Sequence, residues 1–130
     1  VEVGSLRDAL VFAVMETVPD AVRNGDPHPG GALAGIANLS FPGCDGESLL
    51  LLLDALGIEC STGSACSAGV AEASHVLLAM GVSPETALGS LRFSLGHTST
   101  TADVATLARA IGPVVERARA AGVVNWLGVR

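Results

Sequence analysis

Apolar residues recur at helical spacing in several stretches of the chain. In 5–17, Leu6, Leu10 and Val14 fall on one face, and Ser5 precedes them in the position of an N-cap. Similar patterns, with cap and turn residues at their ends, predict further helices over 46–56, 70–80, a short stretch from 83, and 101–121. The expected cap of the 46–56 helix is Asp45. The expected cap of the 101–121 helix is a capping box formed by Thr100 and Asp103. Five consecutive leucines leave the 46–56 helix little polar face, so we expect burial on most sides.

Alternating apolar and polar residues predict the strands. The clearest case is 91–95, where Arg92 and Ser94 share one face and Leu91 and Phe93 share the other. Shorter candidates lie at 21–23, 35–41 and 58–61. The order of elements predicts an α+β fold. We expect one domain, 1–130, built as a small sandwich of three to four short strands with helices mainly on one face.

Charge and composition narrow the classes of function. Of the 130 residues, 49% are hydrophobic and 15% charged, and the net charge is −6 with no cluster of basic residues, so we expect no nucleic-acid partner. The longest aliphatic run ends at Asp54, far short of the roughly 20 residues that a membrane span needs. We therefore expect no membrane association, and a cytoplasmic location.

Lysine is absent, since all seven basic residues are arginine. A mechanism that needs a lysine amine therefore cannot be completed by this chain alone. The three cysteines, an odd number, favour free thiols, although a Cys60–Cys66 bridge stays open. A zinc site from Cys44, Cys60, Cys66 and His75 would lack the usual C-x-x-C spacing, so we expect no metal.

Small residues surround Cys66 between positions 61 and 69, including Gly63, Ser64 and Ala65. Such a segment has little apolar area to bury and predicts an accessible loop, on which a thiol could act as a nucleophile. A free cysteine is also commonly a small buried hydrophobe. From local composition alone, these two readings of Cys66 are equally supported.

Two motifs carry a family resemblance: Ser-Thr-Gly-Ser-Ala-Cys at 61–66 and Ser-Leu-Arg-Phe-Ser-Leu-Gly at 90–96. Together with Asn-Leu-Ser-Phe at 38–41, Gly-Glu-Ser-Leu-Leu at 46–50 and Ser-His-Val-Leu at 74–77, they make nearly the whole chain resemble one domain. The domain that the chain resembles is the C-terminal small domain of the cysteine desulfurases of the class V aminotransferase family. These desulfurases are fold-type I enzymes. The small-residue loop resembles that of the type serving iron–sulfur cluster assembly.

The resemblance implies an enzyme that uses pyridoxal phosphate (PLP) to convert L-cysteine to L-alanine and holds the sulfur as a persulfide. Cys66 matches the persulfide cysteine, with Gly63, Ser64 and Ala65 as its supporting loop. Arg92 matches the arginine that binds the substrate carboxylate; a plain surface arginine paired with an acid is the alternative. The implied partners are the large PLP-binding domain, a second copy in a homodimer, and a sulfur acceptor or iron–sulfur scaffold protein.

The chain departs from this family in length and in its lack of lysine. The PLP-binding large domain is absent from it, so we expect the chain to bind no cofactor and to be inactive alone. A non-catalytic persulfide carrier or interaction module is the alternative function, and a plain structural domain is a third.

Overall fold

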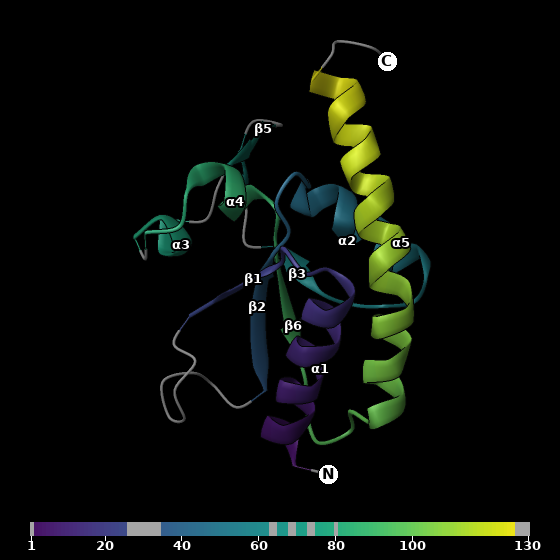
Figure 1. Ribbon diagram of the computed structural model, residues 1–130. Coiled ribbons are helices and arrows are strands. Elements are labelled where there is room, and N and C mark those ends of the chain that lie inside the picture. Colours follow the sequence, from purple (N-terminus) through teal and green to yellow (C-terminus); the bar gives the residue numbers. More distant parts are fainter. Residues whose placement is uncertain are drawn as a thin grey trace.

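A computed structural model of the chain describes residues 2–25, 35–62, 65–67, 70–72, 75–79 and 81–126 (Figure 1). Within these ranges, the side chains of 65–67, 70–72, 75–76 and 122–126 are not described. The elements in chain order are α1 (Val3–Thr17), β1 (Val22–Asn24), β2 (Ile36–Ser40), α2 (Gly46–Ala55), β3 (Ser61–Thr62), β4 (Ala65–Ser67), β5 (Val70–Glu72), α3 (His75–Ala79), α4 (Pro84–Leu88), β6 (Ser90–Ser94) and α5 (Thr101–Trp126).

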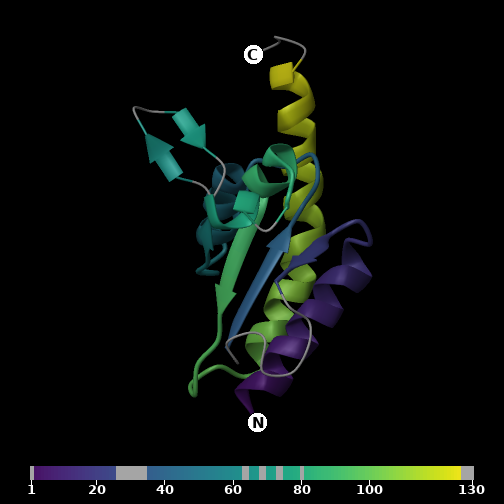
Figure 2. The ribbon, with the colours of Figure 1, turned by 90° about the vertical axis from the view of Figure 1, so that its left-hand side faces the viewer.

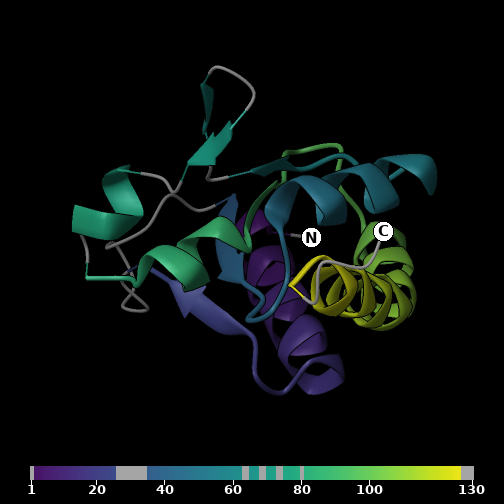
Figure 3. The same ribbon diagram turned by 90° about the horizontal axis from the view of Figure 1, so that it is seen from above.

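Four strands form one antiparallel sheet in the order β1-β2-β6-β3. Helices α1 and α5 pack against each other along one side of it, with α2 beside α5 (Figures 1 and 3). In Figure 2 the strands β2 and β6 lie in front of α5. The face of these strands that the viewer sees is therefore the face turned away from α5. The predicted α+β fold, a small sheet with helices mainly on one face, is confirmed.

The alternation of β2 and β6 explains the two faces of the sheet. Leu39 pairs with Leu91 and Ala37 with Phe93, and all four side chains are buried against the helices. Their neighbours along each strand point to the opposite face, because successive strand residues alternate. The chain thus places its core on the helix side and leaves a polar row on the other.

The predicted caps have the expected hydrogen bonds. The Asp45 carboxylate accepts a bond from the backbone N–H two residues on, at 3.1 Å. Thr100 and Asp103 form the reciprocal box: Thr100 N–H donates to Asp103 Oδ2 at 2.8 Å, and Asp103 N–H donates to Thr100 Oγ1 at 3.2 Å. These bonds fix where α2 and α5 begin.

Several boundaries differ from those expected. Helix α1 begins at Val3, so Ser5 lies inside it and is not the cap. The helix expected over 70–80 is wrong in its first part, because Val70–Glu72 pairs antiparallel with β4 and only His75–Ala79 is helical. The strand expected over 58–61 is reduced to Ser61–Thr62.

Two expectations about helices also need correction. Leu51 and Leu56 are 68% and 58% exposed, so the leucine-rich segment around α2 is not buried on most sides. Helix α5 continues to Trp126, beyond the predicted end at residue 121. In the part of the chain that the structure describes, no helix has both the length and the apolarity to cross a bilayer.

Candidate active site

Cys66 lies in the middle of β4, opposite Ala71 of β5. The two short strands form a separate hairpin that projects from the body of the protein (Figures 2 and 3). In chain order this hairpin follows β3, the edge strand of the main sheet. The side chains of Cys66 and Ala65, and all of Gly63 and Ser64, lie outside the described residues, so the predicted role of this loop stays a prediction.

Arg92 lies on β6 with its side chain on the polar face, and it is exposed, as the alternation predicted. Its Nη2 donates a long hydrogen bond of 3.5 Å to Oγ of Ser61, its register partner on β3. No carboxylate in the described part of the chain forms an ion pair with Arg92. The guanidinium therefore keeps most of its donors available for an anion.

Arg92 belongs to a row of side chains that crosses the whole sheet. Strand pairing aligns Asn24 of β1 with Asn38 of β2, Asn38 with Arg92 of β6, and Arg92 with Ser61 of β3. The row contains only polar side chains, on the face turned away from the core. Sequence analysis missed Asn24 and Asn38 as site residues, because strand register cannot be read from alternation alone.

Hydrogen bonds tie one half of this face into a network. Asn24 Nδ2 donates to Asn38 Oδ1 at 2.9 Å and to Ser40 Oγ at 2.6 Å. Ser40 Oγ lies 2.6 Å from Ser90 Oγ, and Ser90 Oγ donates to the backbone carbonyl of Thr86 at 3.4 Å. Ser40 and Ser90 are completely buried, so the network is rigid on this side.

The other two cysteines sit in places that suppress their reactivity. Burial, with a smaller contribution from the nearby Asp54 carboxylate, raises the pKa of the Cys60 thiol to about 11. Burial also raises the pKa of Cys44, whose Sγ donates to the Val115 carbonyl at 3.8 Å. Both thiols are free and protonated at neutral pH. No three His, Cys, Asp or Glu of the described residues come together as metal ligands.

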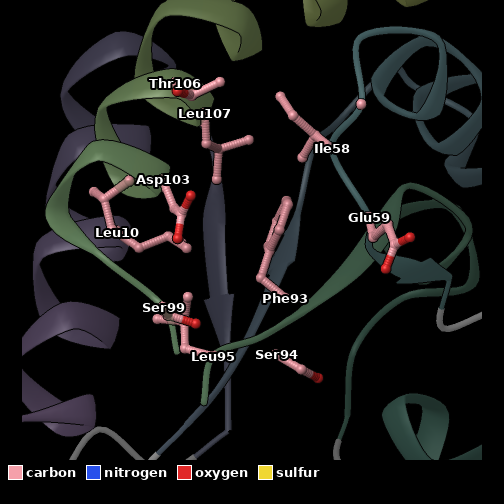
Figure 4. A pocket seen from close by; sticks show the side chains of 12 residues that line it. Leu10, Ile58, Glu59, Phe93, Ser94, Leu95, Ser99, Asp103, Thr106 and Leu107 are labelled. Atoms are coloured by element: carbon pink, nitrogen blue, oxygen red, sulfur yellow. The ribbon is translucent and has the colours of Figure 1, made fainter. Parts of the chain in front are cut away.

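A cavity of about 380 Å³ opens on the helix side of β6 (Figure 4). Leu10 and Leu107 face Phe93 and Ile58 across it, and Asp103 lies at its side. Ser94, which shares a face of β6 with Arg92, lines the cavity, but Asn24, Asn38, Arg92 and Ser61 do not. This cavity is therefore separate from the polar row.

Comparison with known proteins gives a consistent result. The family model described as Aminotransferase class-V matches residues 7–107. The IscS-like cysteine desulfurase of Mycobacterium tuberculosis is 55% identical over 118 residues, which is 91% of this chain and 30% of that protein. The cysteine desulfurase NifS of Azotobacter vinelandii is 40% identical, again over 91% of this chain and 29% of its own length.

Solved structures agree with these relatives. A NifS-like protein superimposes with a TM-score of 0.72 at 29% identity, covering 89% of this chain and 28% of the other. The NifS-like protein from Rickettsia africae gives a TM-score of 0.71 at 26% identity, covering 88% and 28%. The chain thus spans about 30% of the length of the curated relatives it matches.

Proposed function

The chain belongs to the aminotransferase class-V family, and from that membership we propose that it is the C-terminal, nucleophile-bearing domain of a cysteine desulfurase. The observation that carries the proposal is Arg92, exposed and without an ion pair among the described residues, on the strand next to the entry into the Cys66 hairpin. The relatives from Mycobacterium tuberculosis and Azotobacter vinelandii, both cysteine desulfurases, support the same reaction. The full-length enzyme would convert L-cysteine to L-alanine for iron–sulfur cluster assembly or another sulfur transfer.

Cys66 is the residue that we propose takes the sulfur from the substrate. Its sulfur forms a bond to the sulfur of L-cysteine while the carbon–sulfur bond of the substrate breaks, and protons complete L-alanine and the persulfide. One thiol plus L-cysteine thus yields one persulfide plus L-alanine, with no outside oxidant. A hairpin that projects from the sheet suits a group that receives sulfur at one place and delivers it at another.

Arg92 is the proposed binding site for the substrate carboxylate. A guanidinium presents a planar fork of donors that matches a carboxylate, and its attachment to a sheet strand holds that fork in place. The bond from Nη2 to Ser61 occupies one donor and leaves others for the substrate. The plain alternative, a surface arginine paired with an acid, has no support among the described carboxylates.

The residues of this chain do not fit PLP as a resident cofactor. The sequence has no lysine to anchor it covalently, and two of its arginines, Arg7 and Arg119, are already paired with aspartates. We therefore propose that 1–130 is a single C-terminal domain and that a large domain outside this chain holds the cofactor. Bound there, PLP would supply the electron sink for cleavage of the carbon–sulfur bond. The chain alone would be inactive.

The same proposal names the assembly in which the domain works. The full-length enzyme would be a homodimer, would act in the cytoplasm, and would pass the sulfur to an acceptor or iron–sulfur scaffold protein. The family membership supports these partners. None of them involves nucleic acid or a membrane.

The proposal is tested with the full-length enzyme, L-cysteine and two cysteine variants. Cys66→Ala is expected to abolish persulfide formation, and Cys60→Ala, which removes a half-buried thiol from the same segment, is expected to retain it. Alanine release and protein-bound persulfide are measured together. Persulfide formation in Cys66→Ala would contradict the assignment.

The isolated chain supplies the second arm of the test. Mixed with PLP and L-cysteine, it is expected to release no alanine, and release would contradict the need for a large domain. Acceptance of sulfur by the isolated chain from a separate desulfurase, together with failure of any full-length form to act on L-cysteine, would favour a persulfide carrier instead.

A further inference from the structure

Asn38 lies directly opposite Arg92 on the neighbouring strand, in a position that brings their side chains together. Backbone bonds from Leu95 N–H to the Gly35 carbonyl and from Phe41 N–H to the Gly89 carbonyl show which pairs of β2 and β6 exchange hydrogen bonds. Asn38 and Arg92 belong to the alternate, closely spaced class, in which Cα atoms are about 4.5 Å apart. Both side chains rise from the same face of the sheet.

The hydrogen-bond network fixes which way the Asn38 amide points. The Thr86 carbonyl can only accept, so Ser90 donates to it and must itself accept from Ser40. Ser40 has then used its proton and must accept from Asn24, which makes the atom facing it the Asn24 amide nitrogen.

The second hydrogen of the same nitrogen goes to Asn38, so the Asn38 atom that meets it is the carbonyl oxygen Oδ1. The NH₂ group of Asn38 is therefore the end turned away from β1. It donates to no acceptor among the described residues. This orientation leaves Asn24 Oδ1 buried with no partner among the described residues, and leaving a buried acceptor unpaired lowers stability.

Donors consequently gather on this part of the face, where the acceptor that they meet among the described residues is Ser61 Oγ, 3.5 Å from Arg92 Nη2. The Asn38 amide and the Arg92 guanidinium are adjacent, and neither meets a carboxylate in the described part of the chain. We propose that Asn38 determines specificity for the substrate, by donating a hydrogen bond to the same carboxylate that Arg92 binds. This rests on the proposed function of Arg92 and adds a second contact to that site.

The test compares two Asn38 variants of the full-length enzyme. Asn38→Asp keeps an oxygen for the Asn24 bond but places a negative charge beside Arg92, whereas Asn38→Ala loses the Asn24 bond and adds no charge. A role toward the carboxylate predicts that KM for L-cysteine rises about tenfold in Asn38→Ala, the cost of one hydrogen bond to a charged group, and still more in Asn38→Asp. A purely structural role predicts the reverse order.

Binding of the product L-alanine, measured by calorimetry, gives a readout that does not depend on turnover and should weaken in the same order. Ser94→Ala, an exposed residue of the same strand and face, is the matched control and should leave both constants within about twofold. Unchanged KM in both Asn38 variants, or a larger effect in Asn38→Ala than in Asn38→Asp, would overturn the inference while the function stands. A wild-type enzyme that does not act on L-cysteine would overturn the function and this inference together.

Discussion

At the scale of single residues, the availability of Arg92 follows from its neighbours on the sheet. Ser61 and Asn38 flank it with neutral polar groups, so no described carboxylate neutralises it. Arg92→Lys replaces a planar fork by a single ammonium and should raise KM for L-cysteine about tenfold or more in the full-length enzyme. Arg109→Lys, an exposed change on α5, should leave steady-state kinetics unchanged. Equal effects of the two changes would argue against a special role for Arg92.

Cys60 makes a second prediction at this scale, about pH. Its pKa is raised to about 11 from an ordinary value of 9.0, so the folded state holds the thiol proton more tightly than the unfolded state. The stabilisation is complete below pH 9 and is lost as the pH rises toward 11. Urea unfolding of the chain between pH 8 and 11 should show this loss, and the loss should shrink in Cys60→Ala. An identical pH dependence in that variant would contradict the assignment.

The sequence alone predicts the face on which Arg92 lies, but not which residues of other strands lie beside it. Strict alternation over 91–95 places the arginine on a polar face, and the structure agrees. Asn38 and Asn24 are matched to it only by strand register, which depends on contacts between segments far apart in the chain. The raised pKa of Cys60 depends in the same way on burial that local composition does not reveal.

At the scale of elements, the turn between α4 and β6 depends on a glycine. A Cβ on Gly89 would lie 2.6 Å from the carbonyl oxygen of Phe41 and 2.7 Å from that of Cys44, both backbone atoms that cannot move aside. Gly89→Ala should therefore lower the free energy of unfolding by about 2 kcal/mol or more. Urea denaturation measures this, with Gly96→Ala as control because its Cβ would meet nothing within 4 Å. Similar midpoints for the two variants would refute this close approach.

The elements predicted correctly are those whose signals are local. Caps at Asp45 and Thr100 fix helix starts through bonds that span two or three residues, and these helices begin as predicted. The apolar spacing of Val70–Glu72 continues into 75–79 and predicts a helix, yet pairing with β4 overrides that pattern. A three-residue strand carries too few side chains for period-two alternation to be visible.

At the scale of the whole molecule, Arg119 joins three segments that are distant in sequence. From α5 its Nε donates to the Pro42 carbonyl at 3.0 Å, after β2, and its Nη2 donates to both oxygens of Asp20 at 2.8 and 2.7 Å, after α1. The Asp20 pair is partly exposed and should contribute less than about 1 kcal/mol. The bond to Pro42 and the packed stem of Arg119 contribute the rest.

Arg119→Ala should therefore lower the free energy of unfolding by about 1 to 2 kcal/mol, more than Asp20→Asn does. Arg117→Ala, a change of an exposed arginine on the same helix, should change the free energy of unfolding by less than about 0.5 kcal/mol.

Hydrogen bonding to Arg119 lowers the pKa of Asp20. The contribution of this pair to stability is therefore complete above the ordinary pKa near 3.8 and is lost as the pH falls through the lowered value. Acid titration followed by circular dichroism should show a smaller loss of stability in Asp20→Asn than in the wild type, because the asparagine has no proton to gain. If Asp20→Asn destabilised the chain as much as Arg119→Ala, the ion pair rather than the Pro42 contact would be what fastens α5 to the loop after β2.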